Sequence, residues 1–225
     1  MYDYGAVFLF VCSCFFVRLA YAVVHIVLSR CKCVNTKYLK LQDHRQKYIQ
    51  KNITKSAYLL CLVVYAMCTI LVPIYSENVW NTYQIHRLAV LYVSNDFMGI
   101  LCVDKLPNTT RIHHVISTVL VFASLSLDFQ ESDIGQAMFL YTFASATSYL
   151  VNLHLGVRLL VHKGDLLYLR YVAALIYVSA CFCSWTWHVF WFFSRPVLNQ
   201  YHILYLMLLC FIVRDDIILI QWLLC

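Results

Sequence analysis

Charged residues, glycine and proline are all scarce in this chain of 225 residues. Asp, Glu, Lys and Arg together make up 12% of it, whereas a soluble domain has about a quarter. This leaves too little polar surface to cover a water-soluble globule. The chain has only 5 glycines and 3 prolines, which argues against a loop-rich all-β fold. Both shortages favour a helical protein in contact with lipid.

Hydrophobic residues account for 62% of the chain, and they occur in long unbroken runs rather than in alternation. Such runs favour spanning helices over a membrane β-barrel. A spanning helix needs about 20 mostly apolar residues. The sequence therefore predicts an all-α integral membrane protein with about seven transmembrane helices. Their expected ranges are about 5–29, 57–75, 88–104, 114–129, 136–160, 166–193 and 202–224.

Basic residues are concentrated between the first two expected spans, where Asp43 is the one acid. Cytosolic loops of membrane proteins are rich in Lys and Arg. We therefore expect this segment in the cytosol, the N-terminus in the lumen and Cys225 in the cytosol, in the endoplasmic reticulum or a connected membrane. No folded basic face is expected, so nucleic acid is excluded as a partner. The segment holds 8 of the 17 basic residues: Arg30, Lys32, Lys37, Lys40, Arg45, Lys47, Lys51 and Lys55.

Ionisable residues within apolar segments are costly and call for a reason. Asp96 lies in the third expected span, and His113 and His114 open the fourth. Histidine can act as base, acid or nucleophile, and a carboxylate would orient it. We therefore predict a catalytic set of His113, His114 and Asp96; the alternative is two interfacial histidines that bond loop carbonyls. With only one His-His pair, we expect no metal and no cofactor.

Two further polar groups are candidates for lining a lipid cavity. The first follows a 4-3-4 spacing, which is one face of a helix, and either packs neighbouring helices or lines the cavity. The second lies in the middle of the last expected span. Its residues either form ion pairs with one another or with Arg18 across the bundle, or they line the cavity. The first group is Tyr141, Ser145, Ser148 and Asn152, and the second is Arg214, Asp215 and Asp216.

Several short motifs, taken in order, resemble the TLC-domain family, a membrane superfamily that includes ceramide synthases and non-synthase relatives. The resemblance covers roughly residues 40–225 and is closer to the non-synthase branch, because the acidic His-Asp element of the synthases does not follow the histidine pair. The motifs are Gln46-Lys47-Tyr48-Ile49, Lys51-Asn52, Lys55-Ser56, Asn95-Asp96, Leu106-Pro107 through Thr110, His113-His114 and Ser148-Tyr149-Leu150-Val151-Asn152-Leu153.

The resemblance implies six helices forming a ring around a lipid-accessible cavity, preceded by one further helix. It divides the chain into an N-terminal transmembrane helix with the start of the basic loop, 1–39, and a TLC-like domain, 40–225. In ceramide synthases the matching histidine pair serves acyl transfer from acyl-CoA to a sphingoid base. By that resemblance His113 or His114 takes the acyl group or the amine proton, and Asp96 assists.

Two functions remain as hypotheses. The first is a protein that binds, senses or adjusts membrane lipids, with those lipids as its partners. The second is an N-acyltransferase that uses the His113-His114 pair and takes acyl-CoA as a substrate. A seven-helix receptor or transporter is less favoured, since the sequence shows no inverted repeat of broken helices. The sequence leaves the oligomeric state open.

Overall fold

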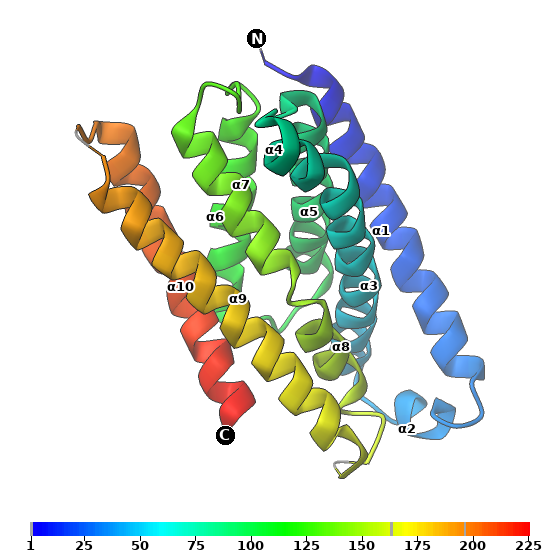
Figure 1. Cartoon of the computed structure of the whole chain (residues 1–225). Coiled ribbons are helices and arrows are strands. Elements are labelled where there is room, and N and C mark those ends of the chain that lie inside the picture. Colours follow the sequence, from blue (N-terminus) through cyan, green and yellow to red (C-terminus); the bar gives the residue numbers. More distant parts are fainter. Residues whose placement is uncertain (1, 163, 196) are drawn as a thin grey trace.

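A computed structural model describes residues 2–162, 164–195 and 197–225 of the chain. Within these ranges the protein is helical and contains no strand. Long helices run side by side between two ends of one bundle (Figure 1). The helices are α1 (Tyr4–Arg30), α2 (Asn35–Leu39), α3 (Asp43–Ala66), α4 (Val72–Glu77), α5 (Thr82–Cys102), α6 (Asn108–Ser124), α7 (Asp133–Ala146), α8 (Tyr149–Val157), α9 (Leu167–Phe193) and α10 (Gln200–Leu224), with a π-helical turn at Met67–Leu71 and a 3-10 turn at Gly164–Leu166.

Three helical segments of the described chain are long and apolar enough to cross a membrane: Tyr4–Arg30, Asp43–Glu77 and Gly164–Phe193. Their outward side chains are large and apolar, and Phe15 and Leu175 are examples of exposed ones. Such surfaces are costly in water and favourable in lipid. The helical class expected from the unbroken apolar runs is therefore confirmed, together with the capacity of these three segments to span.

The helices meet in a definite order of neighbours. α1 lies against α5 and α3. α3 contacts α5 and α8, α5 contacts α6, α6 contacts α10, α10 contacts α9, and α9 contacts α7 and α8. α8 comes close to α3 at Gly156, where an added Cβ would lie 2.7 Å from Ile53 Cγ1 and 3.1 Å from the Ile53 backbone nitrogen. A glycine at this position therefore lets α8 pack directly on α3.

α3 begins at Asp43, well before the expected start of the second span near residue 57. Lysine and glutamine favour helices, and Asp43 in the first turn suits the positive end of the helix dipole. The second half of the basic segment is consequently helical, and one of its faces packs inside the bundle. Lys51 and Lys55, expected in a solvated loop, are instead buried.

The span expected as one helix over 136–160 is broken between α7 and α8, at Thr147 and Ser148. The Thr147 hydroxyl donates to the Ala144 carbonyl at 2.7 Å, and the Thr147 backbone N–H donates to the same oxygen at 3.1 Å. Threonine and serine side chains compete in this way with the helical hydrogen-bond ladder. The expected single helix is thus two segments.

Asp133, at the start of α7, ties this helix to the loop before α10 and to α10 itself. One of its carboxylate oxygens lies 2.8 Å from Arg195 Nη1 and 3.1 Å from His202 Nε2. Burial alone would raise the pKa of this carboxyl. The hydrogen bond with His202, the Arg195 charge and the Ile134 backbone N–H outweigh burial and hold the pKa below its usual value.

We expect the Asp133 contacts to stabilise the protein above about pH 4, the usual range of an aspartate, and to be lost as pH falls through the lower folded pKa. The check is the thermal midpoint of the parent and of Asp133→Asn from pH 7 downwards. The difference between the two proteins should be constant at neutral pH and shrink below about pH 4. A difference that grows in acid would contradict this assignment.

Candidate functional site

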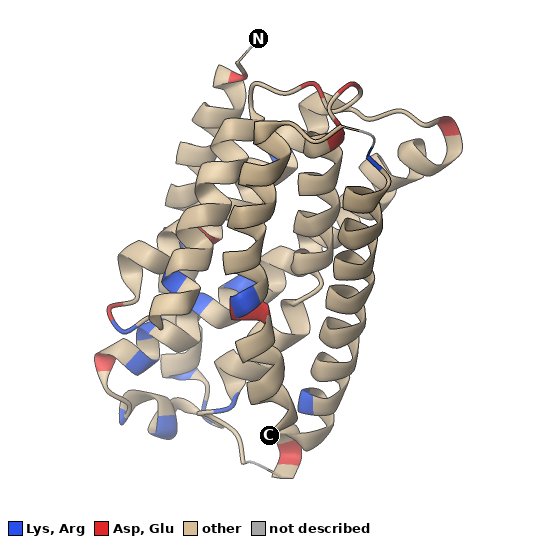
Figure 2. Ribbon diagram, turned by 90° about the vertical axis from the view of Figure 1, so that its left-hand side faces the viewer, with Lys and Arg blue, Asp and Glu red and all other residues tan. Residues whose placement is uncertain are grey.

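A polar cavity of about 280 Å³ lies inside the bundle, towards the end where α3 and α6 begin. Side chains from α3, α5, α6, α7, α8, α9 and α10 line it. Figure 2 shows that Lys and Arg gather in this half of the molecule, the half that contains the C-terminus. The ionisable side chains of the lining are Tyr48, Lys51, Lys55, Tyr92, His113, His114, Arg158, Tyr177, Asp215 and Asp216.

His114 lies next to a buried ion pair. Asp96 on α5 is fully buried, and the Lys55 ammonium donates a hydrogen bond to its Oδ1. Nδ1 of His114 is 3.2 Å from Oδ2 of the same carboxylate. Since α5 and α6 are antiparallel and joined by a short turn, the second turn of α6 meets the last turns of α5. Asp96 can therefore orient the His114 ring.

His113 has a different carboxylate as its neighbour. Its Nδ1 is 3.3 Å from Asp215 Oδ2 on α10, and the Thr110 hydroxyl donates to the other oxygen of Asp215 at 3.2 Å. Successive residues on a helix point about 100° apart, which directs His113 towards α10 and His114 towards α5. The two rings still meet edge to face, with their centroids 5.5 Å apart. The cavity thus presents two adjacent histidines, each beside its own carboxylate.

Asp216 is held by tyrosine hydroxyls. Tyr177 on α9 donates to its Oδ1 at 2.8 Å, and Tyr141 on α7 donates to Oδ2. These bonds join α7, α9 and α10 at one buried point. Hydrogen bonds to both oxygens reduce the cost of burying the carboxylate.

Several polar atoms of the histidine cluster have no hydrogen-bond partner in the described chain. They are both ring nitrogens of His114, Nδ1 of His113 and Oδ2 of Asp96. The two Nδ1 atoms still face carboxylate oxygens at 3.2 and 3.3 Å, whereas Nε2 of His114 has no such neighbour. A buried polar group without a partner costs about 1–3 kcal/mol, so Nε2 of His114 is positioned to bind a polar group of a ligand.

The same cluster has the residue types of a metal site. Asp96, His113 and His114 are buried, and one ligand atom from each lies within 4.8 Å of the others. The Lys55 ammonium bound to Asp96 places a positive charge at this point, and that charge repels a divalent cation. The absence of a metal stays a prediction, and the repulsion between the Lys55 charge and a divalent cation supports it.

The structure brings three predicted polar residues of α7 and α8 to the cavity. Ser145 shares a hydrogen bond of 2.8 Å with the Tyr92 hydroxyl, and the Asn152 side chain donates to the Ser148 carbonyl at 2.9 Å. All three of Ser145, Ser148 and Asn152 line the polar cavity. Tyr141 lines a neighbouring apolar cavity instead and reaches the polar one only through its bond to Asp216.

Arg214 does not join the cavity. It is exposed in an open groove of about 650 Å³ along α9 and α10, and no ion pair of its side chain occurs within the described residues. Asp215 and Asp216 follow it on the helix, so the step of about 100° turns them inwards and leaves Arg214 outside. Neither of the roles expected for Arg214, an ion pair or a place in the lining of the polar cavity, is therefore found in the described part of the chain.

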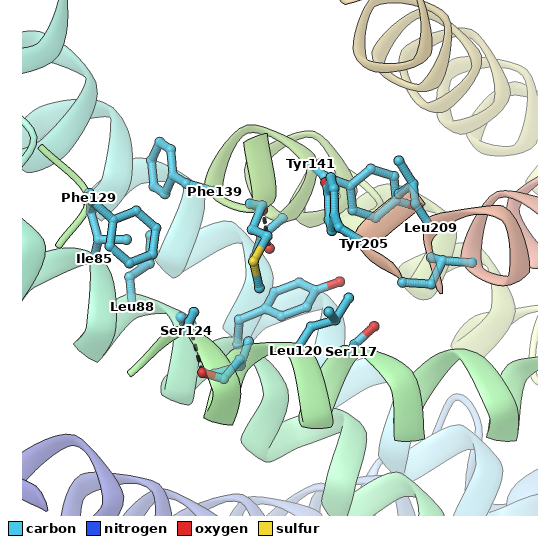
Figure 3. Close-up of a pocket in the computed structure, with 16 residues that line it drawn as sticks. Ile85, Leu88, Ser117, Leu120, Ser124, Phe129, Phe139, Tyr141, Tyr205 and Leu209 are labelled. Carbon is cyan, nitrogen blue, oxygen red and sulfur yellow. Dashed lines mark hydrogen bonds between the residues drawn. The ribbon is translucent and has the colours of Figure 1, made fainter. Parts of the chain in front are cut away.

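An apolar cavity adjoins the polar one, and Tyr92 lines both. It is narrow, with a volume of about 40 Å³, and it runs between α5, α6, α7 and α10. In Figure 3, Ile85, Leu88 and Phe129 lie at one side of this space, and Tyr205 and Leu209 lie across from them. The two cavities together offer adjacent polar and apolar surroundings inside the bundle.

Sequence reasoning missed the cationic side chains of the site, which are Lys51, Lys55 and Arg158. A signal for the first two was present, since Tyr48, Lys51, Asn52 and Lys55 follow a 3-1-3 spacing. That spacing is one face of a helix. The positive-inside interpretation explained the lysines by membrane topology alone and so left their burial unexamined.

Comparisons with known protein families, with curated proteins and with solved structures find no match for this chain.

Proposed function

We propose that the protein is a multi-pass membrane protein of the TLC-domain type that binds membrane lipids in its polar cavity and modifies them by acyl transfer. The observation that carries the proposal is the pair of buried histidines, His113 and His114, each within 3.3 Å of a buried carboxylate. Four ionisable groups buried together in a bundle with apolar outer surfaces are costly without a function to retain them.

In the proposed topology α1, the α3–α4 segment, α5, α6, α7 with α8, α9 and α10 all cross the bilayer. The order of contacts from α3 through α5, α6, α10, α9 and α8 back to α3 supports a ring of six passes, with α1 outside it. The concentration of Lys and Arg in the half that holds the C-terminus supports a cytosolic C-terminus and a lumenal N-terminus. The membrane we propose is the endoplasmic reticulum or one connected to it.

The proposed chemistry transfers an acyl group from acyl-CoA to a lipid amine. The amine nitrogen attacks the thioester carbon, the bond from carbon to sulfur breaks, and the proton of the amine passes through a histidine to the leaving thiolate. His114 has the orientation for this proton transfer, since its Nδ1 lies 3.2 Å from Asp96 Oδ2 and its buried Nε2 has no hydrogen-bond partner in the described chain. His113, beside Asp215, is the second candidate for the same task.

Lipid binding without turnover is the second candidate function. It is favoured by the contact of the polar cavity with the apolar one at Tyr92, because a lipid has one end of each kind. This function needs the two cavities and does not need the histidines to react.

The test is turnover of the purified, reconstituted protein with labelled acyl-CoA and a panel of lipid amines. We expect product from the parent and from His162→Ala, since His162 is exposed and outside the cavity. We expect product to fall to background for the variant carrying both His113→Ala and His114→Ala. If no amine of the panel is acylated and lipid co-purifies with parent and variant alike, acyl transfer is refuted and lipid binding is the better account.

A further inference from the structure

The acids that line the polar cavity or lie next to it all have partners, whereas two of the cations in its lining have no acidic partner. Asp96 is bound by Lys55, Asp215 by Thr110 with His113 beside it, and Asp216 by two tyrosines. Lys51 and Arg158 also line the cavity, and neither forms an ion pair with any acid in the described part of the chain. The two cations without partners are therefore available to an anion from outside the protein.

Lys51 is built into the cavity wall rather than placed on the surface. It is only 4% exposed, and its aliphatic stem packs on α5 at Gly99. An added Cβ at Gly99 would lie 3.0 Å from Lys51 Cε, so the glycine makes room for the extended side chain. Burying an ammonium group without a carboxylate is unfavourable, and an anionic ligand would offset that cost.

Arg158, at the end of α8, is held by aromatic rings. Its guanidinium lies 4.5 Å from the centroid of the Trp222 ring and 5.9 Å from that of Tyr48. Its Nε is buried without a hydrogen-bond partner in the described chain. The two rings offer the guanidinium no hydrogen-bond acceptor, so its N–H groups are available to bind two oxygens of one anion.

We propose that Lys51 and Arg158 form a subsite for the phosphate group of the amphiphile that the cavity binds. Two cations match the double charge of a phosphate, and the guanidinium edge fits two of its oxygens. Thr109 and Asn52 line the same cavity and add polar side chains around the anion. This proposal rests on the proposed function in one respect: it assumes that the polar cavity is the ligand-binding site. It does not assume that acyl transfer takes place. A lipid headgroup and the phosphates of a water-soluble carrier both supply this chemistry.

The experiment measures binding to the full chain in detergent with two matched pairs of probes. Short-chain phosphatidic acid is compared with the diacylglycerol of the same chains, and coenzyme A with pantetheine. We expect at least one phosphate-bearing probe to bind tenfold or more tightly than its phosphate-free counterpart. Preference for phosphatidic acid identifies a lipid source, and preference for coenzyme A identifies a soluble source. No preference in either pair overturns the proposal.

Variants locate the subsite. Lys51→Met and Arg158→Met should each weaken phosphate binding tenfold or more, and Arg214→Met is the matched control because Arg214 lies outside the cavity. Gly99→Ala, which displaces the Lys51 stem and keeps its charge, should weaken binding as well. Parent-like phosphate binding by Lys51→Met would overturn the assignment.

A second readout separates a binding role from a structural one. Without ligand, Lys51→Met should melt at a higher temperature than the parent, because a buried ammonium without a carboxylate has been removed. A large fall in melting temperature would instead show that Lys51 supports the fold. All these readouts are independent of turnover, so absence of turnover in the parent together with intact phosphate binding would refute acyl transfer alone.

Discussion

Replacing Lys55 by methionine is expected to lower the free energy of unfolding by about 3–5 kcal/mol. Lys55 and Asp96 are both buried, and their ion pair joins α3 to α5. Removing the ammonium leaves the Asp96 carboxylate charged inside the bundle, with the two histidines His114 and His113 beside it. The loss is much larger than that of an ordinary surface pair because water cannot solvate the remaining charge.

The measurement is unfolding of the purified protein in mixed detergent, with two comparisons. Lys47→Met removes an exposed lysine that lies 2.8 Å from Asp43 and 3.2 Å from Asp104, and it should lower the free energy of unfolding far less than Lys55→Met does. Lys55→Met combined with Asp96→Leu removes both charges and should be more stable than Lys55→Met alone. Equal losses for Lys55→Met and Lys47→Met would show that the Lys55 pair is not buried.

Gly156→Ala is expected to destabilise the protein by about 1–3 kcal/mol, although alanine favours helices more than glycine does. The new methyl group would lie 2.7 Å from Ile53 Cγ1 and 3.1 Å from the Ile53 backbone nitrogen. Both distances are shorter than a normal contact, so α8 must move away from α3. These two helices carry Lys51 and Arg158, and the shift should therefore also weaken ligand binding at the cavity.

Two further variants check this explanation by thermal unfolding. Gly164→Ala introduces the same methyl group where the nearest atom is 3.5 Å away, on the His162 ring, and it should be close to neutral. Ile53→Ala in the Gly156→Ala background should recover part of the lost stability. It removes the overlap with the Ile53 side chain and leaves the close contact with the Ile53 backbone nitrogen. If Gly164→Ala is as harmful as Gly156→Ala, close packing of α8 on α3 is not the cause.

The helical class was predictable because apolar runs of spanning length leave little alternative for the backbone. The residues at which the helices begin and end were less predictable. Hydropathy locates the lipid-facing part of a helix, and it missed the start of α3 at Asp43 because the first turns are polar yet helical. It also missed the break at Thr147, which depends on a local hydrogen bond from a side chain rather than on polarity.

The same contrast holds for the site. Contacts that follow from the order of the helices were predictable, and contacts that depend on the rotation of a helix about its axis were not. The approach of Asp96 to His114 follows from two antiparallel helices joined by a short turn, which chain order alone suggests. The direction in which Arg214 points depends on how α10 is rotated against its neighbours. Three consecutive charged residues cannot reveal that rotation, and the structure turns only the last two of them inwards.

The length of the α3–α4 segment has a consequence for how a ligand would arrive. The continuous helical segment Asp43–Glu77 has 35 residues. At 1.5 Å per residue it is roughly 52 Å long, whereas the hydrocarbon layer is about 30 Å thick. In the proposed topology its apolar second half fills that layer, which would place Lys51 and Lys55 at the depth of the headgroups. In that topology a lipid of the same leaflet would reach the cavity by lateral diffusion with its chains still in the bilayer, and it would avoid an extraction cost of about 0.8 kcal/mol for each methylene group.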